Sequence, residues 1–280
     1  MHINFTVEDR DHVEGIGPIQ VGWFLTDDKA AILFEAPYRM RSQSQTKHAK
    51  SASRCPAVLQ LESRYSVINC PFDFHLRFDR DNTGKPTLIN VLGDASPVRG
   101  NKLRELLTLV NENEWRTPNV PILQLKLPYC FIADEVVYIT QLDAFGHYRK
   151  NPLPGTIFGG RFPIHIWPRP LMWAFEWHDT SKDLILKRGE PLFYCQFDGF
   201  DPSRTVKLVQ AEKTPELMQY IDQISGVVNY VNQTFSLFSE AEKIKPINLL
   251  IMKKGEFKHE VRQFQKPYDN QQAEQISLMV

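Results

Sequence analysis

The sequence has few cysteines, no long apolar run and no excess of charge of either sign. Four cysteines in 280 residues are too sparse for a disulfide framework, which excludes the small disulfide-stabilised secreted domains. The longest apolar runs, such as residues 129–133, are far too short to span a bilayer. Lys and Arg together number 33, as do Asp and Glu. No overall field therefore attracts the chain to nucleic acid or to a membrane, and we expect neither as a general partner.

The first residues also lack the features of an export signal. Residues 1–6 lead into an acidic stretch at 8–11, with no basic flank and no apolar segment. Together with the sparse cysteines, this indicates a reducing compartment. We expect a cytoplasmic protein.

Aromatic residues and prolines are plentiful, with 18 Phe and 19 Pro, which favours strands separated by turns. Residues 72–78 alternate apolar and polar side chains, the pattern of a half-buried strand, and residues 81–84 follow as a hairpin turn. Other strands are expected over residues 19–25, 30–35, 64–70, 87–92, 122–127, 136–142, 171–177, 184–187 and 191–197. This spacing predicts a mainly β chain, either an antiparallel β-sandwich or a jelly roll.

Two details of this sheet are specific enough to test. Residues 171–177 and 191–197 are expected to be adjacent central strands. Residues 30–35 are expected to return beside residues 19–25 as a hairpin. Residues 102–110 fit either a short helix or a strand.

One helix is well signalled near the C-terminus. Thr214 can cap it, Pro215 suits the first helical position, and apolar residues recur at helical spacing. We expect a helix over residues 215–232 that covers one face of the sheet, and a second amphipathic piece over 231–242. Residues 1–252 are then one β-rich domain with a C-terminal helical element, and residues 253–280 a polar tail or arm.

Two stretches of the sequence carry a family resemblance. Residues 53–58 (SRCPAV) with 70–73 (CPFD) form one, and residues 166–177 (IWPRPLMWAFEW) with 186–194 (LKRGEPLFY) form the other. Together they resemble uncharacterised proteins encoded by tailed phages of marine bacteria and cyanobacteria, over the central two-thirds of the chain. The resemblance implies a viral source and the cytoplasm of a bacterial host. It implies no activity and supplies no catalytic residues.

A non-haem iron site on a jelly roll is the first candidate chemistry. Such a site uses a His-x-Asp/Glu pair, a distant His, and often an Arg about ten residues beyond it that binds a dicarboxylate. His178 and Arg188 fit the second half of this pattern. The first half is not matched, because the His-x-acid triplet at residues 12–14 precedes the first expected core strand. The alternative places His178 in an exposed turn and Arg188 in a hairpin.

Zinc is the second candidate, since His48, Cys55, Cys70 and His75 are of the right ligand types. Their spacings differ from the tight Cys-x2–4-Cys knuckles that make such motifs specific. The sequence therefore favours two buried thiols and two surface histidines. Cys55 lies beside Arg54, which would favour a reactive thiolate, but we expect it to be a small buried residue.

Residues 39–54 are the most charge-biased segment and show no apolar periodicity. The segment contains Arg39, Arg41, Lys47, Lys50 and Arg54, with no acidic residue between them. We expect an exposed loop that contacts phosphate or an acidic partner, or that is simply solvated.

The tryptophans of the central region are the candidates for a ligand pocket or an oligomer interface. Trp173 and Trp177 share one face of an expected strand with Phe175, and Trp167 lies close in sequence. Each indole N–H needs a partner, which suits a lined pocket or an interface. The alternative, which we favour, is a large aromatic core.

The absence of a convincing site favours a non-catalytic binding or assembly protein of phage origin, with a homo-oligomer or another protein as partner. The alternative is a metal-dependent, non-haem iron oxygenase-like enzyme on a jelly-roll scaffold, using His178 and Arg188. The sequence identifies no cofactor.

Overall fold

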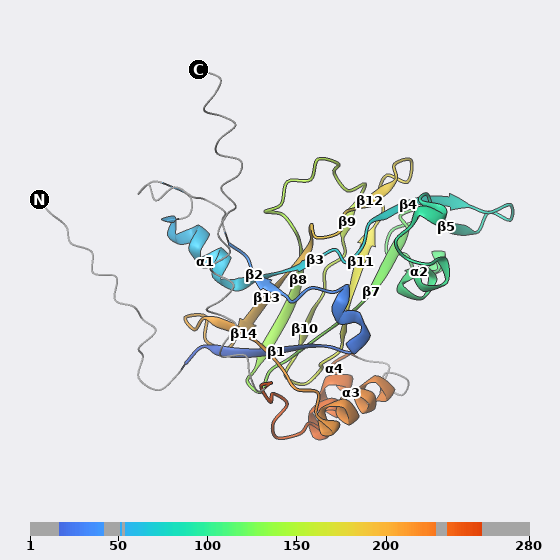
Figure 1. Cartoon of the computed structure of the whole chain (residues 1–280). Helices are drawn as coiled ribbons and strands as arrows, with labels where there is room; N and C mark the ends of the chain where they lie inside the picture. Colours follow the sequence, from blue (N-terminus) through green and yellow to red (C-terminus); the bar gives the residue numbers. More distant parts are fainter. Residues whose placement is uncertain (1–16, 42–50, 52–53, 228–233, 254–280) are drawn as a thin grey trace, which may run out of the picture.

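Figure 1 shows a computed structural model of the chain, which describes residues 17–41, 51, 54–227 and 234–253. Strands predominate, and they form three sheets. The first sheet has the order β14 (Val206–Gln210), β1 (Ile19–Leu25), β7 (Ile122–Ile132), β11 (Pro170–Glu176) and β9 (Thr156–Ile157), with β6 (Leu107–Leu109) beside β7. The second has the order β10 (Arg161–Pro163), β8 (Val137–Asp143), β13 (Pro191–Gly199), β3 (Tyr65–Asn69) and β2 (Tyr38–Arg39). The third consists of β12 (Leu184–Leu186), β4 (Phe74–Arg80) and β5 (Pro86–Asn90).

The main core joins the three sheets through their apolar faces. Leu125 and Phe175 come from the first sheet, Phe193 from the second, and Phe74 and Leu76 from the third, all in one buried cluster. Phe74, Leu76 and Leu125 alternate with exposed or half-exposed neighbours along their strands, as a period-two pattern requires. Phe193 instead lies between two buried residues of β13. The mainly β, sandwich-like architecture is thereby confirmed. A jelly-roll order of strands is not confirmed.

Helices cover the other face of the first sheet. Helix α3 (Pro215–Val227) buries its apolar stripe against Phe24 of β1 and Ile132 of β7, and α4 (Thr234–Lys243) packs beside it (Figure 1). The Leu217 backbone N–H donates to the Thr214 hydroxyl, 3.2 Å away, so the expected cap forms. The predicted sheet-covering helix and the second amphipathic piece are both confirmed. Residues 228–232 and 254–280 lie outside the described part.

The remaining helices are short: α1 (Pro56–Arg64), α2 (Gly100–Leu106) and the 3-10 turns η2 (Asp28–Ile32), η4 (Gly93–Ala95) and η5 (Glu112–Glu114). The ambiguous segment 102–110 is divided between α2 and β6. None of the helices in the described residues is long and apolar enough to cross a membrane.

The expected hairpin of residues 30–35 with β1 is wrong. Residues 28–32 form η2 instead, with the Lys29 N–H bonded to the Asp27 carboxylate at 2.9 Å. The reason is that both edges of β1 are already paired, one with β7 and the other with β14. A local hairpin partner would have no free edge to join.

The expected adjacency of residues 171–177 and 191–197 is also wrong. Strand β11 pairs with β7 and β9 in the first sheet, whereas β13 pairs with β3 and β8 in the second. Between them, β12 pairs with β4, and the chain then turns at Gly189, whose φ of 78° a glycine adopts without strain. The chain therefore crosses between sheets where the sequence suggested a hairpin.

Candidate functional site

A groove opens between the first and second sheets along one side of the sandwich. Its walls include β14, the edge strand of the first sheet, and β2, the edge strand of the second, which lie on the same side of the molecule (Figure 1). The end of α1 also contributes to the wall. The groove has a volume of about 750 Å³, within the size range of ligand sites.

Four cationic side chains line this groove: Arg39 of β2, Arg41 just after it, Arg64 at the end of α1, and Lys207 of β14. None of the described residues that line the groove is acidic. The described lining therefore carries four positive charges and no negative one, although the whole chain has no net charge. We call this feature the basic groove.

Two of these guanidinium groups bind backbone carbonyls. Arg39 Nη2 donates to the Ser63 carbonyl at 3.3 Å, and the Arg64 guanidinium donates to the Pro202 carbonyl. Partial burial lowers the pKa of Arg39 from its ordinary value, and repulsion from Arg41 lowers it further, against a smaller opposing effect of the Glu62 carboxylate. An anion entering the groove would relieve both the lost hydration and the repulsion.

The walls also have an apolar part. Val206 and Leu208 of β14 are half-buried and pack against the main core, and Phe197 of β13 is fully buried beneath the groove lining. A ligand that combines negative charge with apolar groups matches this composition better than a simple ion does.

The basic segment predicted from the sequence is only partly brought into the groove. Arg39 and Arg41 line it, and Arg39 ends a short strand instead of starting a loop. Arg54 precedes α1, with its N–H bonded to the Ser51 carbonyl. Lys47 and Lys50 lie outside the described residues. Arg64 and Lys207 were not predicted from the sequence, because only the sheet order places them near Arg39, and no local pattern signals that.

His178 and Arg188 have separate surroundings. His178 follows β11, and its Nε2 lies 3.1 Å from the Thr156 hydroxyl and 4.0 Å from a carboxylate oxygen of Glu176. Arg188 lies in the turn after β12, where its backbone N–H donates to the Asp73 carboxylate at 2.9 Å. In the described part of the chain, no group of three or more His, Cys, Asp or Glu is arranged to hold a metal ion.

Glu176, the carboxylate beside His178, is paired with an arginine. Its carboxylate is only 2% exposed, and it accepts hydrogen bonds from Arg116 Nε at 2.9 Å and Nη2 at 2.6 Å. The Arg116 guanidinium also lies over the ring of Phe158, 4.8 Å from its centre. This buried carboxylate is therefore charge-compensated by the protein itself.

The zinc candidates are likewise held by other contacts. Cys70 is buried and donates to the Phe72 carbonyl at 3.1 Å, and burial raises its pKa to about 12. His75 lies 2.7 Å from the Asp183 carboxylate. Cys55 is exposed immediately before α1, contrary to the buried position expected, because no residue of α1 is buried. His48 is outside the described residues.

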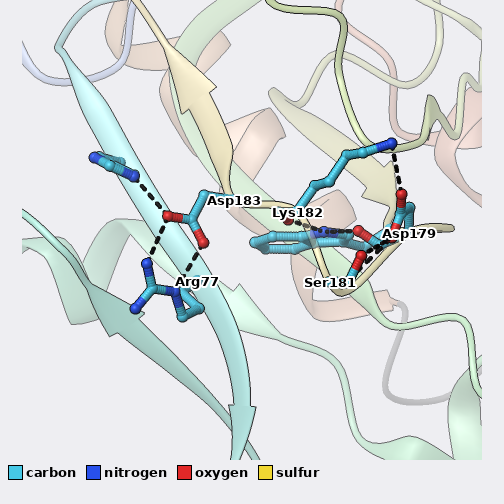
Figure 2. Close-up of polar contacts among 7 residues, drawn as sticks. Arg77, Asp179, Ser181, Lys182 and Asp183 are labelled. Atoms are coloured by element: carbon cyan, nitrogen blue, oxygen red, sulfur yellow. Dashed lines mark hydrogen bonds and ion pairs between the residues drawn. The ribbon is translucent and has the colours of Figure 1, made fainter.

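Asp183 forms a polar clamp between β12 and β4. It accepts two hydrogen bonds from Arg77 at 2.8 and 2.9 Å, and Figure 2 shows the two side chains facing each other, with Asp179, Ser181 and Lys182 in the preceding turn. These bonds, and then that of His75, lower the pKa of Asp183 to about 2. Both carboxylate oxygens of Asp183 are therefore engaged by side chains of β4.

The candidate tryptophans fall into two buried clusters. Trp173 stacks on Phe175 with ring centres 5.3 Å apart, and Trp177 donates its indole N–H to the carbonyls of Asp179 and Lys182 at 3.1 Å. Both belong to the main core. Trp167 instead contacts Phe238 of α4 beneath the helices. All three are buried in this chain, as an aromatic core requires.

Comparison with protein-family models, curated proteins and solved structures found no match to this chain. The phage origin and the cytoplasmic location stay predictions.

Proposed function

We propose that this chain is a non-catalytic binding protein that holds an anionic part of a partner in the basic groove. The supporting observation is that four cations, from β2 and the residues after it, α1 and β14, converge on one concavity of about 750 Å³. Guanidinium groups bind carboxylates and phosphates through paired, charge-assisted hydrogen bonds, which makes two or more arginines on one wall an effective anion receptor.

The composition of the groove also favours binding over chemistry. Hydroxyl groups are present at Ser63, Ser66 and Thr205. Among the described lining residues, however, no carboxylate or imidazole stands beside them to act as a general base. Hydroxyls without such a base are poor nucleophiles and serve as hydrogen-bonding groups instead.

Fluorescence anisotropy with a labelled hexaglutamate peptide tests this proposal. Arg39→Glu and Arg64→Glu should each weaken binding by roughly tenfold or more, since each exchanges attraction for repulsion at a close charge pair. Binding should also weaken as salt is added, because the groove is open to solvent.

Lys150→Glu is the matched control, since Lys150 is exposed, lies outside the groove and makes the same change of charge. Its affinity should stay close to that of the unaltered protein, and circular dichroism should show that all three variants are folded. Equal losses for all three variants, or no binding by the unaltered protein at low salt, would contradict the proposal.

A further inference from the structure

Strand β14 pairs with the first sheet on one side only. The Ile19 N–H donates to the Thr205 carbonyl at 2.9 Å, and the Ala211 N–H donates to the Trp23 carbonyl at 2.8 Å, with Val206 opposite Ile19 in parallel register. Residues of a strand turn their backbone groups alternately to its two sides. Val206, Leu208 and Gln210 therefore turn their N–H and C=O groups away from β1.

At one end, this outward edge of β14 already pairs with an extended segment of the same chain. The Lys253 N–H donates to the Gln210 carbonyl at 3.1 Å, and the Glu212 N–H donates to the Ile251 carbonyl at 2.7 Å, in an antiparallel bridge. Nothing in the described residues pairs in this way with Val206 or Leu208. Both residues line the basic groove. The unpaired part of the edge and the four cations thus belong to one site.

We infer that the groove takes an extended acidic segment of a partner protein, which adds as a strand to the outward edge of β14. This inference rests on the proposed function and specifies its ligand. Backbone groups of Val206 and Leu208 supply the pairing, as in other cases of strand addition to a sheet edge. Because side chains of a strand alternate, one set can reach the cations while the other meets the half-buried walls.

A nucleic acid would use this site less completely. Its backbone cannot pair with an open strand edge, and single-strand binders rely on exposed aromatic rings for stacking. Tyr38 is the exposed aromatic residue among the described lining residues, and its hydroxyl is bonded to Asn69 at 3.2 Å. Carboxylates on an extended peptide therefore fit the site better than phosphates on an oligonucleotide.

Two peptides of equal charge separate strand addition from attraction alone. The probe is a capped peptide of alternating Glu and Val, and its control has N-methyl groups at alternate residues along the pairing edge. Loss of two or more backbone hydrogen bonds should weaken binding by roughly tenfold or more, although the charge is unchanged. An oligothymidylate of the same charge should bind more weakly than the unmethylated peptide.

Hydrogen exchange of the full chain locates the pairing. The amides of Val206 and Leu208 should exchange quickly in the unbound protein and slowly with the unmethylated peptide. Equal binding of both peptides, equal binding of the oligothymidylate, or amides already protected without peptide would each overturn strand addition. None of these three results contradicts anion binding in the groove, whereas failure of every anionic probe to bind would contradict the proposed function itself.

Discussion

The aromatic stack of β11 allows a sharp test of how the core is built. Phe175 has no exposed surface, lies flat on Trp173 with ring centres 5.3 Å apart, and meets Trp177 edge-on at 6.1 Å. Phe175→Ala removes the middle ring of three. Substitutions of this kind cost about 3–5 kcal/mol of unfolding free energy, and the cost is highest where neighbours cannot collapse into the cavity.

Collapse is restricted here on both sides. Trp177 is held by its two indole hydrogen bonds, and Gly155 lies so close that a Cβ built there would be 2.9 Å from Phe175 Cζ. We therefore expect the upper part of the range, in a protein whose total stability is of the order of 5–15 kcal/mol. The melting temperature should fall by roughly 8–20 °C.

Urea unfolding followed by tryptophan fluorescence measures this change. Phe200→Ala is the matched control, because the Phe200 side chain is 93% exposed and its removal should alter stability by no more than about 0.5 kcal/mol. The same urea slope for both proteins would show that only stability has changed. A loss below about 1 kcal/mol for Phe175→Ala, or equal losses for the two variants, would show that the ring of Phe175 is not a main support of this core.

Three other predictions concern separate parts of the chain. Gly159→Ala should destabilise the protein by about 1–3 kcal/mol in urea unfolding, because its Cβ would lie 2.1 Å from the Gln141 carbonyl oxygen, whereas Gly160→Ala meets open space and should be nearly neutral. The pKa of Asp183 is lowered to about 2, below the value of about 3.9 in an unfolded chain, so the ionised carboxylate stabilises the fold fully above about pH 4 and loses this effect as the pH falls toward 2. Asp183→Asn should therefore reduce the dependence of the unfolding free energy on pH between about 4 and 2. An unchanged dependence in the variant would contradict this role of Asp183. A thiol reagent should modify Cys55 in the folded protein and the buried Cys70, Cys130 and Cys195 only after unfolding, and Cys55→Ser should abolish the rapid reaction.

Local patterns in the sequence predicted the elements that depend on local forces. The alternation of residues 72–78 corresponds to β4, and the turn after it contains Gly84 at a φ of 81°. Thr214 and Pro215 start α3 as expected. In each case the controlling contacts lie within a few residues of one another. Helix α1 was not expected from the sequence, and it buries none of its residues.

The site depends on long-range pairing and could not be predicted in the same way. Strand β14 was not expected at all, and its parallel pairing with β1 brings Lys207 into the same groove as Arg39. The same pairing removed the free edge that a hairpin at residues 30–35 needed. Arg39 and Arg41 were singled out by composition alone, which identified one wall of the groove but neither the other wall nor the groove itself.

The pairing of β1 with β14 also sets an order of events during synthesis. Arg204 donates to the Gly17 carbonyl across 187 positions of the chain. At about 5–20 residues added per second, β14 is synthesised roughly 10–40 s after β1. Throughout that interval at least one edge of β1 is open to other chains. Because β14 forms one wall of the basic groove, the groove is then among the last features to form. Binding of an anionic probe to a nascent or refolding chain would therefore indicate that folding is complete.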